Sequence, residues 1–213
     1  MKITKFKHSC LLVEMPEPVS RTVLFDPGVY SEQALDVSKL EYLDDIVISH
    51  AHPDHCSLDL LMQLTAAFPD VSITAPAEVV TELTEQGIPN VAVTPPKGIT
   101  LFNSPHESVA PLFPLPEQIG VHYIDTLTHP GDSHSFSETK TILALPVAGP
   151  WASTIRAINL AIELKPKYVL PIHDWHWSDE AREQLYANIA KALQDEGIHF
   201  VPLVTGEPVV IDV

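Results

Sequence analysis

Three histidines and one aspartate lie within the six residues that begin at His50 and end at His55 (His-Ala-His-Pro-Asp-His), directly after a short apolar run. That run, residues 45–49, is apolar on both faces and predicts a strand buried beneath helices. Because the end of a strand fixes the backbone, side chains of the following turn can converge on one point. His50 and His52 can then reach one metal ion, while Asp54 and His55 can turn to a second. The alternative is a polar loop whose histidines only cap the next helix.

Strands and helices are predicted to alternate along the rest of the chain. Helices are predicted over residues 57–68, from Pro76 to near Gly87, between the cap Ser178 and Gly197, and around a face formed by Ile155, Ile158 and Ile162. Strands are predicted over residues 2–8, 10–15, 22–25, 71–74, 91–94, 100–102, 121–127, 141–145, 168–172, 200–204 and 209–211. Four prolines between 104 and 120 predict a long loop. We therefore expect two sheets packed together and covered by helices, in one domain over residues 1–213.

The charge of the chain limits its partners. Its 213 residues include 12 Lys and Arg against 28 Asp and Glu, a formal net charge of −16 at pH 7. Such a chain repels phosphate backbones, so we expect no nucleic-acid partner, whereas a small anionic substrate held by metal stays open. No apolar run approaches the roughly 20 residues of a membrane span, so no membrane partner is expected. The two cysteines, Cys10 and Cys56, imply no disulfide framework and favour the cytoplasm, and a homo-oligomer remains open.

The segment from His50 to His55 resembles the HxHxDH signature of the metallo-β-lactamase superfamily. The resemblance implies an α/β fold, a four-layer αββα sandwich, with one or two metal ions, usually zinc, at the rim between the sheets. The Gly149-Pro150 pair and the segment Leu-Pro-Ile-His at 170–173 resemble the compact branch of zinc-dependent hydrolases related to ascorbate-6-phosphate lactonase.

Three later residues match the further ligands of that family. They are His106 in Ser-Pro-His-Glu, Asp132 in His-Pro-Gly-Asp-Ser, and His173 in Leu-Pro-Ile-His. The resemblance assigns the ligands of two metals with a bridge between them: His50, His52 and His106 for one, Asp54, His55 and His173 for the other, and Asp132 as the bridge.

This donor set predicts a metal-dependent hydrolase. Five imidazoles and two carboxylates suit two zinc ions, with Mn²⁺ or Fe²⁺ as alternatives. Metal coordination lowers the pKa of water from 15.7 to about 7, so a dinuclear metal-bound hydroxide can attack a small ester, lactone or phosphoester. In this mechanism Asp54 and Asp132 are catalytic, because they position the metals and relay a proton.

Four further residues are candidates for supporting or substrate-binding roles, each with a simpler alternative. Asp26 is expected to orient a metal-bound histidine, as in the resembled family, or to serve only the turn before Pro27. His8 matches a histidine-serine pair of some branches of the family and reaches the site from outside the coordination sphere, or lies on the surface. His134 contacts substrate or shuttles a proton, or is a polar loop residue. Trp175 walls the substrate site, or packs around the next helix cap.

Other functions remain open for the same motif. A small phosphodiesterase or nuclease would use the same metals, although the net charge of −16 disfavours long polyanions. A non-hydrolytic enzyme similar to sulfur dioxygenases would bind a single iron. A non-catalytic binding module would typically have lost ligands, and this chain has kept them all.

Overall fold

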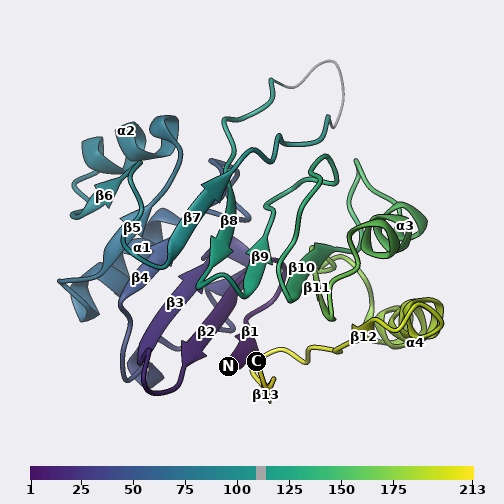
Figure 1. The fold of residues 1–213 in the computed structure, drawn as a ribbon. Coiled ribbons are helices and arrows are strands. Elements are labelled where there is room, and N and C mark those ends of the chain that lie inside the picture. Colours follow the sequence, from purple (N-terminus) through teal and green to yellow (C-terminus); the bar gives the residue numbers. More distant parts are fainter. Residues whose placement is uncertain (109–113) are drawn as a thin grey trace.

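Two β-sheets lie face to face in the computed structural model, which describes residues 1–108 and 114–213 (Figure 1). The first sheet runs, in order across it, through β13 (Pro208–Val210), β1 (Lys2–Lys5), β2 (Leu11–Met15), β3 (Arg21–Phe25), β4 (Asp45–Val47), β5 (Ser72–Thr74) and β6 (Val91–Ala92). The second runs through β12 (His199–Phe200), β11 (Tyr168–Ile172), β10 (Ile142–Pro146), β9 (Leu127–His129), β8 (Gly120–Tyr123) and β7 (Ile99–Phe102). Residues 109–113 of the predicted loop over 104–120 lie outside the described residues.

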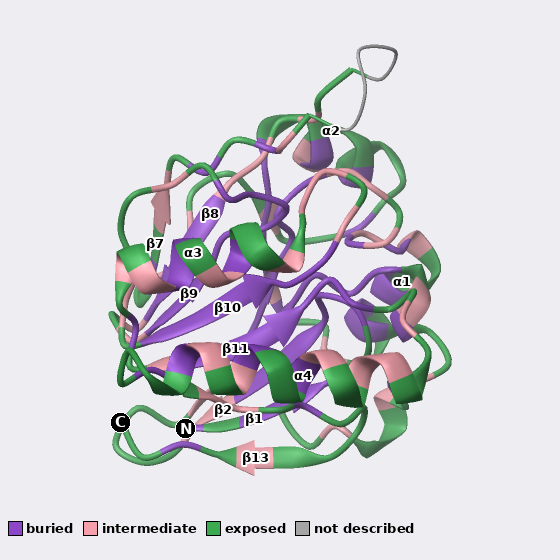
Figure 2. Ribbon diagram, turned by 90° about the vertical axis from the view of Figure 1, so that its right-hand side faces the viewer, coloured by how far each residue is buried: buried purple, intermediate pink, exposed green. Residues whose placement is uncertain are grey.

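Helices cover the outer face of each sheet (Figures 1 and 2). The helices α1 (Leu58–Ala67) and α2 (Ala77–Glu85) pack on the first sheet, and α3 (Thr154–Leu164) and α4 (Asp179–Gln194) pack on the second. Two short 3-10 helices, η1 (Val29–Ser31) and η2 (Val37–Lys39), follow β3. Ser57, Ser153 and Ser178 cap α1, α3 and α4 by accepting a backbone N–H of the first turn. None of the described helices is long and apolar enough to cross a bilayer.

Side-chain alternation along the strands produces the layers. In β10, Ile142 and Ala144 point into the core between the two sheets, while Leu143 and Leu145 pack under α3 and α4. In β3, Leu24 faces α1 and α2, whereas its neighbours on either side face the other sheet. Since a sheet buried on both faces needs apolar residues at successive positions, these strands read as continuous apolar runs. The four-layer αββα arrangement predicted from the sequence is confirmed.

The single strand predicted over 121–127 is wrong. The structure has a hairpin of β8 and β9, because Ile124 and Asp125 both adopt left-handed φ angles of 48° and 49° and Thr126 N–H donates to Tyr123 O at 3.0 Å. Two successive left-handed residues form the tight turn that matches the twist of a hairpin. A β-branched residue such as Ile124 rarely takes this conformation, so its presence concealed the turn.

Other expectations also need correction, among them the strands over 2–8 and 91–94, which end at Lys5 and Ala92. The predicted face of α3 is rotated, because Ile155 is 72% exposed while Ala157 and Ala161 are buried against the second sheet. The strand expected over 200–204 shortens to β12, since Pro202 has no N–H to donate to the neighbouring strand.

The loops that carry the polar motifs all lie at the same edge of the sandwich. The strands β3, β4 and β5 run parallel in the first sheet, as do β9, β10 and β11 in the second. The chain therefore passes from β4 into the 50–55 loop and from β9 and β11 into the loops that hold Asp132 and His173.

Candidate metal centre

The first motif lies in a turn between β4 and α1. His55 N–H donates to His52 O at 2.9 Å, which folds the loop back on itself. The Ser57 N–H then donates to Pro27 O at 2.9 Å, and the Ser57 hydroxyl caps α1. The strand end and the capped helix therefore hold the intervening side chains from both sides.

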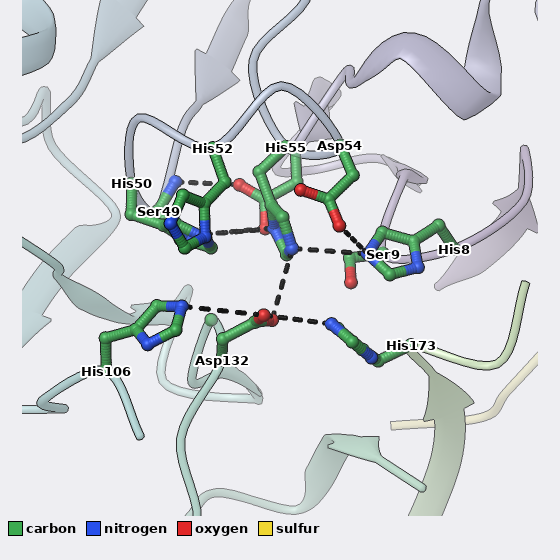
Figure 3. Close-up of polar contacts among 12 residues, drawn as sticks. His8, Ser9, Ser49, His50, His52, Asp54, His55, His106, Asp132 and His173 are labelled. Carbon is green, nitrogen blue, oxygen red and sulfur yellow. Dashed lines mark hydrogen bonds and ion pairs between the residues drawn. The ribbon is translucent and has the colours of Figure 1, made fainter. Parts of the chain in front are cut away.

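The structure brings the seven predicted ligands together (Figure 3). Metal-binding atoms within 4.8 Å of one another form a first group of His50, His52 and His106, a second of His8, Asp54, His55 and His173, and a third of His50, His55 and Asp132. The first two groups contain the two ligand sets that the family resemblance implies, and the second also includes His8.

Asp132 lies between these groups. Its Oδ1 is 3.1 Å from His55 Nε2, while its Oδ2 is 2.9 Å from His173 Nε2 and 3.7 Å from His106 Nε2. Burial alone would raise the pKa of Asp132, but the charges of His173 and His55 hold that pKa well below its ordinary value. The carboxylate is thus ionised and faces both sides of the centre.

His8 lies closer to the centre than the sequence suggested. Its Nε2 is 3.1 Å from Asp54 Oδ2 and 3.3 Å from His55 Nε2, and the ring is fully buried. The backbone carbonyl of His8 also accepts the N–H of His173 at 3.3 Å. The alternative of a surface histidine is therefore wrong.

Burial keeps several of these imidazoles neutral. Desolvation lowers the pKa of His8 to about 4, and it lowers the pKa of His50 and of His106 below the ordinary value. A neutral imidazole offers the lone pair that a cation needs. These rings are therefore in the protonation state of metal ligands.

Asp26 holds His55 from behind. Its carboxylate is fully buried, with Oδ2 2.7 Å from His55 Nδ1 and Oδ1 accepting the Ser49 N–H at 2.7 Å. When Nδ1 of His55 carries the proton, Nε2 faces the other candidate metal-binding atoms. Burial alone lowers the pKa of His55, yet Asp132 and Asp26 outweigh it and raise that pKa well above the ordinary value. A bound cation would replace the Nε2 proton.

The donors present fit divalent cations. His106 Nε2 is buried without a hydrogen-bond partner among the described residues, although buried polar atoms are rarely left unpaired. His50 Nε2 and His52 Nδ1 lie only 3.0 Å apart and point to the same place as His106. A cation at that place would satisfy all three atoms, so the residues fit the group that the fold implies.

Two polar residues that the sequence did not single out support this arrangement. The Ser49 hydroxyl lies 2.8 Å from Asp26 Oδ2 and 2.9 Å from His50 Nδ1. Glu107 accepts the N–H of His134 at 3.0 Å and pairs with Arg156 of α3 at 2.9 Å. Their only signal in the sequence was adjacency to a predicted ligand.

A cavity of about 540 Å³ opens over the centre. Its walls include His52, Asp54, His106, Asp132, Trp151 and Trp175. Trp175 is 43% exposed and stacks on Tyr30 with 4.0 Å between ring centroids. Trp175 thus lies where a substrate wall was predicted.

His134 lies behind this cavity. Its Nε2 donates to the carbonyl of Pro146 at 2.8 Å, and its ring packs edge-on against Trp151 at 5.3 Å. We therefore expect His134→Ala to loosen Trp151 and change KM by up to about tenfold without reducing metal content. Steady-state kinetics with metal analysis measures both, and His122→Ala, on β8, is a control expected to change neither. Loss of metal from His134→Ala would contradict this placement.

Gly28 determines how closely the 50–55 loop approaches η1. A Cβ on Gly28 would overlap the carbonyl oxygen of Asp54 and the amide nitrogen of His55. Its φ of −90° is ordinary, so the close approach is what requires glycine. We expect Gly28→Ala to displace the loop and reduce metal affinity by about 10- to 100-fold, measured by competition with a chelator. Gly87→Ala meets open space but strains a left-handed φ of 80°, so it should lower stability and keep full metal affinity. An unchanged affinity for Gly28→Ala would contradict the prediction.

Comparison with known proteins shows which family and which proteins this chain resembles. Residues 2–173 match the model of a family described as a beta-lactamase superfamily domain. Protein Rv0786c of Mycobacterium tuberculosis is 28% identical over 205 residues, which cover 90% of this chain and 92% of that protein.

Solved structures share the fold. Igni18, a novel metallo hydrolase from the hyperthermophilic archaeon Ignicoccus hospitalis, superposes with a TM-score of 0.72 at 19% identity, covering 100% of this chain and 98% of that one. The isothiocyanate hydrolase from Delia radicum gut bacteria superposes with a TM-score of 0.65 at 15% identity, covering 99% of each chain.

Proposed function

The chain belongs to the metallo-β-lactamase superfamily, and from this premise we propose that it is a metal-dependent hydrolase of small esters, lactones or phosphoesters. The observation that carries the proposal is the convergence of five histidines and two aspartates from loops of both sheets. Two divalent cations, zinc by preference of so many imidazoles, are the proposed cofactor. The proposed ligands are His50, His52 and His106 for one cation, Asp54, His55 and His173 for the other, with Asp132 between them.

The cations would lower the pKa of a water molecule to about 7 and polarise the substrate oxygen. The protein's own groups orient this chemistry. Asp26 keeps the His55 proton on Nδ1. Asp132 lies between the two proposed ligand sets and contacts His55. Asp54 lines the cavity with its side chain 27% exposed, and His8 and His55 hold its pKa below the ordinary value against the effect of burial. Its ionised carboxylate is the proposed acceptor of the proton from the attacking water.

The proposed substrates are small organic molecules. Trp151, Trp175 and Pro150 give the 540 Å³ cavity apolar walls. The metal-binding side chains at its floor lie where a carbonyl or phosphoryl group of the substrate would bind. A lactone fits both features and agrees with the resemblance to the ascorbate-6-phosphate lactonase branch.

Metal analysis followed by substrate screening tests this function. Protein expressed without added metal is expected to hold two divalent ions per chain, with zinc predominating. It should hydrolyse members of a panel of aryl esters, lactones, and cyclic and linear phosphodiesters, lose that activity to a chelator and regain it with zinc. One iron per chain with oxygen consumption would instead indicate a dioxygenase. A protein that binds no metal and ignores the chelator would overturn the proposal.

A further inference from the structure

A second, larger cavity of about 900 Å³ lies beside the metal centre. Its walls come from α4, from residues 200–205 and from the turn that follows β1. His8 lines this cavity and also belongs to the second donor group, with its Nε2 3.1 Å from Asp54 Oδ2. The large cavity therefore extends to the edge of the metal centre.

Tyr30 and Trp175 form a wall that the two cavities share. Both residues line the 900 Å³ cavity and the 540 Å³ cavity over the metal centre. Their rings are stacked with 4.0 Å between centroids and 20° between planes. A ligand that extended past the edge of these two stacked rings would occupy both cavities at once.

The large cavity presents an apolar surface. Its lining includes Trp177, Ala187, Ala190, Phe200, Pro202 and Leu203. Its volume lies within the range of about 300–1,000 Å³ that is usual for sites of drug-sized ligands.

The buried charged groups in its lining are already paired with one another, whereas Lys7 and Glu183, which also line it, are exposed to solvent. Lys5 Nζ lies 2.5 Å from Asp174 Oδ1, the Tyr186 hydroxyl donates to Asp174 Oδ2 at 2.5 Å, and Arg182 Nε lies 3.2 Å from the same oxygen. A ligand thus does not need polar atoms to satisfy them, and apolar atoms can occupy the space without a desolvation penalty on an unpaired charge.

We propose that the 900 Å³ cavity binds an alkyl or aryl group of the substrate while the bond to be hydrolysed lies at the metal centre. The substrates are then amphiphilic, with an ester, lactone or phosphoester head and an apolar chain or ring. This inference rests on the proposed function, because it names the substrate class of the same site.

Binding of straight-chain carboxylates from acetate to decanoate tests the cavity without any turnover. The metal-loaded protein is titrated with each carboxylate, and tryptophan fluorescence reports binding because Trp175 and Trp177 line the cavity. We expect affinity to rise by about fourfold for each added methylene group until the cavity is filled.

A pair of neighbouring substitutions on α4 localises the effect. Ala187 lines the cavity, whereas the adjacent Asn188, which is also exposed, does not. Ala187→Phe should weaken decanoate binding by at least about tenfold and leave acetate binding unchanged, because its ring takes the space of several methylenes. Asn188→Phe should match the wild type. Ala190→Phe provides a second cavity variant if Ala187→Phe does not fold.

The outcomes separate this inference from the proposed function. Chain-length-dependent binding that Ala187→Phe weakens, without hydrolysis of any ester, supports the cavity and overturns the hydrolase. Equal kcat/KM for acetyl and decanoyl esters, unaffected by Ala187→Phe, supports the hydrolase and overturns the inference. A dimer that Ala187→Phe dissociates, with carboxylate affinity independent of chain length, would show that a second copy covers the cavity and would also overturn it.

Discussion

Replacement of Asp132 by alanine is expected to lower kcat/KM on the order of 10³-fold or more while the protein stays folded. The carboxylate lies within 3.1 Å of His55 Nε2 and 2.9 Å of His173 Nε2, so its loss leaves two donor sets with nothing between them. Asp132 is not part of the three hydrophobic clusters, which the substitution leaves intact. Steady-state kinetics, circular dichroism and metal analysis of the purified variant measure these effects.

Asp125→Ala is the matched control for this prediction. Asp125 lies in the hairpin turn before β9, its side chain is 87% exposed, and it pairs with Lys140 at 2.6 Å. An exposed pair of this kind contributes about 1 kcal/mol or less and should not affect turnover. Wild-type activity in Asp132→Ala would show that the carboxylate has no part in the reaction.

Replacement of Lys5 by methionine is expected to destabilise the fold by about 3 kcal/mol. Lys5 is 2% exposed, and its Nζ lies 2.5 Å from Asp174 Oδ1 and 2.9 Å from Pro171 O. Without Lys5, the buried Asp174 carboxylate loses its main counter-charge. The cost should fall at the lower end of the usual range, because Tyr186 and Arg182 still contact that carboxylate. Urea denaturation measures the free energy of unfolding.

Two comparisons show whether the buried charge is the cause. Lys2→Met, on the same strand, removes an exposed pair with Glu14 and should cost at most about 1 kcal/mol. Adding Asp174→Asn to Lys5→Met removes the stranded charge and should restore part of the lost stability. If Lys5→Met costs no more than Lys2→Met, the buried pair contributes nothing measurable.

Much of the site could be predicted because several donors follow a recognisable strand end, whereas Asp132 was assigned only through the resemblance to a known family. The 50–55 motif and His173 come directly after apolar runs, and those runs form β4 and β11. Because β4 and β11 belong to different sheets, the convergence of these donors depends on the packing of the two sheets, which places the ends of their parallel strands at the same edge of the sandwich. The layering was equally predictable, since continuous apolar runs require cover on both faces.

Other features depend on contacts between distant segments, which a single sequence does not display. At Gly28, for example, the approach of the Asp54 carbonyl is what excludes a side chain. Lys5 has its partner, Asp174, just after β11 and 169 residues away along the chain. The left-handed conformation of Ile124 was hidden because intrinsic preference opposes it, and hairpin pairing overrides that preference.

The loops that supply the donors belong to opposite halves of the sandwich, with His50 to His55 on one sheet and His106, Asp132 and His173 on the other. A cation held by both would act as a reversible cross-link, and any ligand bound by the native state alone stabilises it by RT ln(1 + [L]/Kd), about 4 kcal/mol at a thousandfold excess over Kd. Resistance of the protein to heat and to proteases would then follow the cellular supply of that cation.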